Sequence, residues 1–123
     1  MKMLSFLMQD SLVQVSSSNT GEVDKDLVVS RLNYIKNQEN FEWVYSHKVH
    51  YLNIPISFDI ETSSFYEGVA KKAIMYIWTC NVNGTTFIGR TWKQFTQFLD
   101  LMSEVFGLIK YNKRCLIYVH NLE

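Results

Sequence analysis

Apolar and polar residues recur along two segments of the chain with the spacing of amphipathic helices. Residues 24–38 begin with acidic side chains, which favour a helix N-terminus, and carry apolar residues at Leu27, Val28, Leu32 and Ile35. In residues 91–109, Thr91 and Gln94 form a capping-box pair at the start. The apolar residues of this second segment follow a repeat of three and four: Trp92, Phe95, Leu99, Met102, Phe106 and Ile109. We therefore expect helices over both segments.

Strands are predicted between the two helices, where aromatic and β-branched residues gather. Residues 43–63 have this composition, and Pro55 marks either the start of a strand or a break between two strands. Residues 73–80 are apolar at nearly every position, which is typical of a strand covered on both faces.

A hairpin follows, because Asn83 and Gly84 favour a tight turn that returns the chain along residues 85–90. After the second helix, residues 110–114 are predicted to form a basic loop that leads into a last strand over residues 115–122. The resulting order of strands and helix predicts an α/β (α+β) fold with a mixed sheet and helical cover.

Length and composition indicate one folded unit, since 123 residues with 47% hydrophobic side chains can bury a single core. Residues 11–22 are rich in Ser, Asn, Thr and Gly and predict a loop. We expect residues 1–50 to form an N-terminal extension of loop, helix and strand that packs on a core of residues 51–123.

The charge balance and the cysteines restrict the environment of the protein. Twelve basic and twelve acidic side chains give a formal charge of zero, so no global positive field attracts nucleic acid. Cys80 and Cys115 lie in apolar runs without zinc-ligand spacing, and we expect reduced thiols. The apolar run in residues 1–10 is shorter than a secretory signal or a membrane span. We therefore expect a cytoplasmic protein without membrane association.

Two carboxylates stand out in the stretch SFDIETSS, residues 57–64. Side chains two apart on a strand share a face, so Asp59 and Glu61 are expected to lie side by side, followed by the hydroxyl of Thr62. Such oxygen ligands suit Mg²⁺ or Mn²⁺, and paired ions can activate water for phosphodiester hydrolysis. The alternative is that both carboxylates simply face solvent on a half-exposed strand.

The sequence around this pair resembles a known family. SFDIETSSFY, residues 57–66, resembles the first exonuclease motif of family B DNA polymerases, in which Asp-x-Glu opens the 3′→5′ proofreading domain. YVHNLE, residues 118–123, resembles the start of the second exonuclease motif in the protein-primed branch, which occurs in bacteriophages and linear plasmids. The hairpin and helix between the two motifs also follow the family's order.

The resemblance covers residues 54–123 and implies a ribonuclease H-like exonuclease fold. It implies that Asp59 and Glu61 are catalytic metal ligands for Mg or Mn, and that Thr62, His120 and Asn121 contact the 3′ end of a DNA single strand. The family's remaining two carboxylates lie beyond the matched segment, and their motifs are not in this sequence. Because a two-metal site needs all its ligands, we expect weak metal binding and little or no nuclease activity from this chain alone.

Three hypotheses of function follow. The first is a truncated or split exonuclease domain of a phage-type polymerase, connected with DNA replication and completed by a separate polypeptide. The second is a free-standing interaction protein of a mobile element, such as an inhibitor of a host nuclease or defence protein. The third is a single-stranded nucleic-acid binder, which zero net charge disfavours. An incomplete sheet exposes edges and apolar surface, so we expect a protein partner: the polymerase remainder, a host protein or a second copy.

Other chemically suggestive residues have ordinary interpretations. His47 and His50, three apart on a predicted strand, are expected to face opposite ways rather than to share a metal. The basic residues within 110–114 suit a solvated turn, although they could contact phosphate. Helical spacing predicts a core position rather than base stacking for Trp92, Phe95, Phe98 and Phe106.

Overall fold

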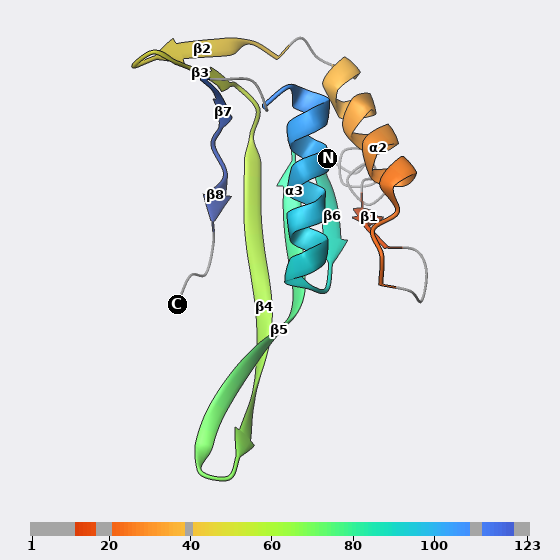
Figure 1. The fold of residues 1–123 in the computed structure, drawn as a ribbon, viewed down its shortest axis with the longest axis vertical. Helices are drawn as coiled ribbons and strands as arrows, with labels where there is room; N and C mark the ends of the chain where they lie inside the picture. The colour runs from red at the N-terminus through yellow and green to blue at the C-terminus, as the bar shows by residue number, and fades with distance from the viewer. Residues whose placement is uncertain (1–11, 17–20, 39–40, 109–111, 120–123) are drawn as a thin grey trace, which may run out of the picture.

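The computed structural model describes residues 12–16, 21–38, 41–108 and 112–119 (Figure 1). These residues form a mixed α+β fold with two sheets and two helices. The predicted fold class, a mixed sheet with helical cover, is therefore confirmed. None of the described helices is long and apolar enough to cross a membrane.

The larger sheet has five strands in the order β1, β6, β5, β4, β8. Its centre is an antiparallel meander of β4, β5 and β6. A parallel strand flanks the meander on each side, since β1 pairs with β6 and β8 pairs with β4. The strands span β4 (Ile56–Glu67), β5 (Ala70–Val82), β6 (Thr85–Gly89), β1 (Leu12–Gln14) and β8 (Tyr118–Val119).

The smaller sheet has three strands in the order β2 (Trp43–Ser46), β3 (Val49–Leu52) and β7 (Lys113–Cys115). Strands β2 and β3 are antiparallel, and β7 runs parallel to β3. The chain passes from β3 through Pro55 into β4, so the proline lies at the break between two strands. In Figure 1 the smaller sheet lies at one end of the larger sheet.

Two helices, α2 (Lys25–Gln38) and α3 (Trp92–Phe106), cover one face of the larger sheet (Figure 1). Asp24 caps α2, since its carboxylate accepts the Leu27 N–H at 3.2 Å. The buried residues of α2 are, as its pattern predicts, Val28, Leu32 and Ile35. Residues from β1 and α2 share one core with residues from β4, β5, β6 and α3.

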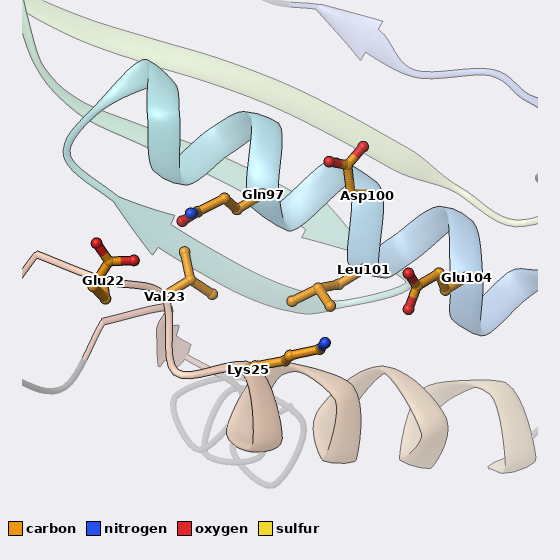
Figure 2. Close-up of a pocket in the computed structure, with 7 residues that line it drawn as sticks. All are labelled: Glu22, Val23, Lys25, Gln97, Asp100, Leu101 and Glu104. Atoms are coloured by element: carbon orange, nitrogen blue, oxygen red, sulfur yellow. The ribbon is translucent and has the colours of Figure 1, made fainter.

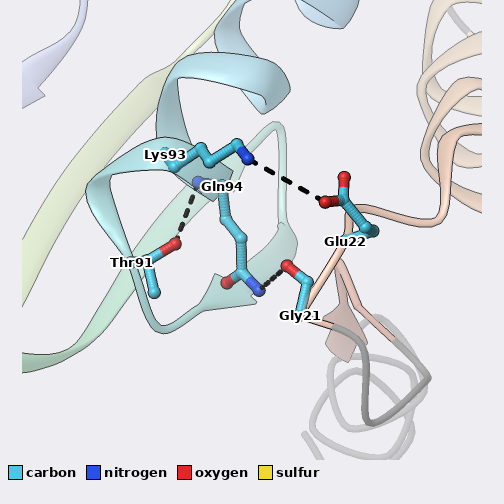
Figure 3. Close-up of polar contacts among 5 residues, drawn as sticks. All are labelled: Gly21, Glu22, Thr91, Lys93 and Gln94. Atoms are coloured by element: carbon cyan, nitrogen blue, oxygen red, sulfur yellow. Dashed lines mark hydrogen bonds and ion pairs between the residues drawn. The ribbon is translucent and has the colours of Figure 1, made fainter.

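The start of α3 is tied to the loop that precedes α2 (Figure 3). The Thr91 hydroxyl accepts the backbone N–H of Gln94 at 3.1 Å, which is the predicted cap. The buried Gln94 amide then donates to the carbonyl of Gly21 at 2.8 Å. Lys93 and Glu22 add an exposed ion pair at 3.9 Å. Gln94 therefore joins two segments that are 73 residues apart.

The buried face of α3 differs from the predicted stripe. Trp92 is 51% exposed, so the core position predicted for it is wrong, whereas Phe98 is fully buried as predicted and packs against the rings of Trp78 and Phe87. The helix also ends before residue 109, since Gly107 adopts a left-handed φ of 72° that terminates it. The residues of α3 that are buried are Gln94, Phe98, Leu101, Met102 and Phe106. The predicted position of Ile109 lies outside the described residues.

Beyond the sheet, β4 and β5 continue as a two-stranded ribbon (Figure 1). Strand β8 pairs with β4 only at residues 57–58, and β6 pairs with β5 only at residues 78–82. The tip carries Gly68 at a φ of 65° and the fully exposed Val69. Within the described residues, the ribbon therefore has no strand beside it on either edge.

Candidate functional site

The carboxylate strand β4 has a core face and an open face. Ile56 and Phe58 are buried, and the Phe58 ring stacks on Phe95 of α3 with centroids 4.4 Å apart. Strand alternation therefore directs Asp59 and Glu61 to the opposite face, away from α3. Among the described residues, no helix covers this second face.

Asp59 and Glu61 lie on one face of β4, as their spacing predicts. Asp59 is half-buried and pairs in register with Thr79 of β5, whereas Glu61 is exposed and pairs with Ile77. Both carboxylates take part in hydrogen-bonding or electrostatic interactions. The pair thus belongs to the surface of the open face rather than to the core.

Thr62 does not join the two carboxylates. It is exposed, and alternation along β4 gives it the opposite face from Glu61. A register shift follows Glu61, because Thr62 pairs with Met75 and Tyr76 has no partner on β4. Such a bulge bends the ribbon and increases its twist at the point where it leaves the sheet.

The start of the second motif lies directly beside the carboxylate strand. Tyr118 pairs with Ser57, and Val119 pairs with Phe58, in parallel register. Two segments about sixty positions apart in the chain therefore run side by side in the same direction. The other residues predicted for this motif, His120 and Asn121, lie outside the described residues.

The two carboxylates fit part of a magnesium or manganese site. Oxygen donors are the ligands that these ions prefer, and Mg²⁺ often binds through one or two carboxylates together with water and substrate phosphates. In the described part of the chain, no group of three or more His, Cys, Asp or Glu side chains is arranged to hold a metal. Asp59 and Glu61 thus offer two carboxylate groups to such an ion.

The two cysteines are free thiols. Burial raises the pKa of Cys80 from its ordinary value of 9.0 to about 12, with a smaller contribution from the nearby Cys115. Burial also raises the pKa of Cys115. Neither thiol is therefore an activated nucleophile, since thiolates carry that reactivity.

Described residues line a pocket beside the two helices and a groove beside the smaller sheet. A pocket of about 330 Å³ lies between α3 and the start of α2 (Figure 2), and carboxylates dominate its polar lining. Its residues are Glu22, Val23, Lys25, Gln97, Asp100, Leu101 and Glu104. A groove of about 530 Å³ lies between the smaller sheet and β8, and its lining includes Val44, Tyr51, Ile54, Pro55, Leu116 and Tyr118. Neither hollow contains Asp59 or Glu61.

The smaller sheet corrects two predictions. His47 lies in the turn between β2 and β3 rather than on a strand, and Lys113 and Arg114 belong to β7 rather than to a loop. Parallel pairing with residues 50–52 of β3 makes this polar segment a strand. The local sequence gives no such signal, because Lys and Asn are uncommon in strands. As a result, sequence reasoning missed that Lys113 lies beside His50.

Comparisons with protein-family models, curated proteins and solved structures found no match to this chain. Inference about function therefore depends on the residues themselves and on the contacts that the fold creates between them.

Proposed function

We propose that this chain is part of a metal-dependent 3′→5′ exonuclease domain related to the protein-primed family B DNA polymerases. In this proposal Asp59 and Glu61 hold Mg²⁺ or Mn²⁺ weakly, and catalysis needs the family's other two carboxylates in addition. The proposal rests on the resemblance of residues 57–66 and 118–123 to two exonuclease motifs and on the pairing of the strands that carry them.

The parallel pairing of β8 with β4 is the observation that carries the proposal. A two-metal site requires ligands from both motifs within a few ångströms of the same phosphate. Because Val119 is paired with Phe58, the described part of the second motif lies beside the residue that immediately precedes Asp59 on β4. This juxtaposition was not implied by the amphipathic patterns, and it supports one shared site.

The chemistry sets an expectation for the isolated chain. A divalent ion held by Asp59 and Glu61 would polarise a phosphodiester and lower the pKa of bound water. This sequence has two of the four carboxylates of the related domains, and Glu61 is exposed. Few ligands and water competition give low metal affinity, so hydrolysis requires the family's two further carboxylates, which residues 1–123 do not contain.

Paramagnetic Mn²⁺ tests the metal pair without relying on activity. Titration into the ¹⁵N-labelled protein is expected to broaden amide signals around Asp59 first, and Asp59→Asn is expected to remove that broadening. Glu67→Gln, at the exposed ribbon tip, is the matched control and should leave it unchanged. Equal broadening around β4 in wild type and Asp59→Asn would contradict the metal role.

A second experiment tests the nuclease. The chain is mixed with a polypeptide that carries the missing aspartate motifs, and a 5′-labelled single strand is followed with Mg²⁺. We expect 3′-end shortening only in the mixture, and none with Asp59→Asn. Shortening that survives this substitution would rule out the proposed ligand.

The surface around β8 favours a second candidate function, a protein-interaction module such as an inhibitor of a host nuclease or defence protein. Leu116 is 58% exposed, Tyr118 is 67% exposed and Val119 is 43% exposed. Leu116 and Tyr118 line the groove beside β8, which is the edge strand of the described larger sheet. Exposed apolar residues along a strand edge are typical of protein-binding surfaces.

Affinity capture from cells that carry the native genetic element distinguishes the two candidates. Wild type, Asp59→Asn and Leu116→Asp are compared. Recovery of a polypeptide with the missing aspartate motifs supports the exonuclease. Recovery of an unrelated nuclease or defence protein that Leu116→Asp loses and Asp59→Asn retains supports the interaction module.

A further inference from the structure

We propose that the smaller sheet, formed by β2, β3 and β7, binds single-stranded nucleic acid. Unpaired bases stack on Tyr45 and His50, while Lys48 and Lys113 contact phosphates. The proposal does not rest on the exonuclease function, because it uses none of the carboxylates of β4.

A row of three side chains crosses the smaller sheet. Tyr45 of β2 pairs with His50 of β3, and His50 pairs with Lys113 of β7. Paired residues lie on the same face of a sheet, so a phenol, an imidazole and an ammonium group follow one another across the strands. The Tyr45 and His50 rings have centroids 4.8 Å apart, and Tyr45 is 61% exposed. This row gives a base an aromatic surface next to a cation.

Lys113 is held at the end of this row by an aromatic ring. Its ammonium nitrogen lies 4.4 Å from the ring centroid of Trp43, which is a cation–π contact. Trp43 packs against the core, so it anchors a side chain that otherwise has many rotamers. A positioned lysine loses less conformational entropy when it binds a phosphate than a free one does.

Positive charge is concentrated on the smaller sheet although the whole chain is neutral. Within the described residues 41–53 and 112–116, the cations are Lys48, Lys113 and Arg114, and the one carboxylate is Glu42. Zero net charge disfavours nucleic-acid binding only if the charges are evenly spread. Their separation creates a basic surface that can attract a phosphate chain locally.

The turn between β2 and β3 adds a second observation. His47 and Lys48 have φ values of 51° and 66°, in the left-handed region that favours Gly and Asn. Both side chains are exposed at the tip of the hairpin. Glycine would relieve the backbone strain at these two positions. The presence of a histidine and a lysine there suggests that their side chains have a function.

Single strands fit this surface better than a duplex does. Stacking needs a base face that is not already covered by its neighbours, and exposed aromatics on a small sheet bind unpaired bases of any sequence. Lys113 beside the rings and Arg114, which follows it on β7, provide charges at both faces of the edge strand. Tyr51 pairs with Arg114 and adds a second aromatic on the reverse face.

Fluorescence anisotropy with a labelled oligothymidylate of about ten nucleotides tests the proposal. We expect affinity at low salt to weaken as salt rises, with Tyr45→Ala and Lys113→Gln each reducing it about tenfold. Lys113→Gln should also lower the salt slope by about one. Tyr66→Ala and Lys71→Gln are matched controls, because these exposed residues pair on the distant ribbon.

The outcomes are distinct. A loss of oligonucleotide affinity that is confined to Tyr45→Ala and Lys113→Gln, with unchanged circular dichroism spectra, supports the proposal. No binding at low salt, or equal loss in the ribbon variants, overturns it. Duplex DNA that binds as tightly as the single strand, with no effect of Tyr45→Ala, overturns base stacking. Direct binding of labelled polyglutamate without any oligonucleotide binding would indicate an acidic protein ligand and also overturns the proposal. The assay contains EDTA, so a metal ion at Asp59 takes no part in it, and this test and that of the exonuclease fail separately.

Discussion

Val119 is paired with Phe58 in parallel register, and through this pair the last described strand lies against the strand of the two carboxylates. The pair also marks a division between the two faces of β4. Phe58 faces the core and stacks on Phe95, whereas the next residue, Asp59, belongs to the open face. One strand therefore both anchors α3 and presents the proposed metal ligands, so substitutions on its two faces should have separable effects.

Substitution of Gly89 tests the closest approach in the core. A Cβ at Gly89 would overlap the indole of Trp78, which is fully buried and donates its Nε1–H to the Thr91 carbonyl at 2.9 Å. We expect Gly89→Ala to lower the free energy of unfolding by about 2 to 3 kcal/mol, measured by urea denaturation. Gly68→Ala, at a left-handed position without neighbours, should cost about 1 kcal/mol. An equal cost at both positions would contradict the overlap.

The hydrogen bonds at the start of α3 predict that Thr91→Ala and Gln94→Ala lower the free energy of unfolding by different amounts. Thr91→Ala removes one bond to a helix N–H and should cost about 1 kcal/mol. Gln94→Ala is expected to cost about 2 kcal/mol or more, because the buried amide also accepts from Arg90 and donates to Gly21. Gln97→Ala is the control on the same helix, and thermal denaturation measures all three. A smaller loss of stability in Gln94→Ala than in Thr91→Ala would contradict a stabilising bond between Gln94 and Gly21.

The buried thiols predict that stability falls in alkaline solution. The pKa of Cys80 rises from 9.0 to about 12 on folding, so above pH 9.0 the unfolded chain releases a proton that the folded chain retains. The free energy of unfolding therefore decreases with pH between these values, by at most about 1.4 kcal/mol per unit for this group. Urea denaturation at several pH values measures the slope. Cys80→Ala should make it shallower, and an unchanged slope would show that Cys80 does not contribute.

Residues with strong local preferences were predictable from the sequence. Asp24 and Thr91 begin the two helices, and Asn83 and Gly84 form the expected turn with φ values of 50° and 96°. Each of these features depends on neighbours within four positions. The same-face placement of Asp59 and Glu61 follows from strand periodicity in the same way.

Features that depend on distant neighbours were not predictable. Lys113 is in a strand only because β3 pairs with it, and the turn at His47 lacks the glycine that marks such turns. The burial of Gln94 depends on the carbonyl of Gly21. The row from Tyr45 to Lys113 joins segments that no local pattern connects, so the basic surface becomes visible only in the fold.

The ribbon of β4 and β5 should be separable from the fold. No strand other than these two pairs with the ribbon within the described residues. Among the side chains that the structure describes, Phe58 and Trp78 are the buried residues nearest the ribbon on the two strands. Replacement of residues 63–74 by an Asn-Gly turn joins Thr62 to Met75, which are already paired. We expect the free energy of unfolding to change by less than about 1 kcal/mol, because an isolated two-stranded hairpin contributes little stability.

Urea denaturation and amide hydrogen exchange measure the effect of this deletion. Exchange in β5 at residues 78–82 should stay as slow as in wild type, since β6 still pairs with this segment. A loss of several kcal/mol would mean that the ribbon packs against other parts of the chain. In that case the open face of β4, including Asp59, would be covered rather than accessible. The result of the Mn²⁺ titration at Asp59 would then have to be reinterpreted.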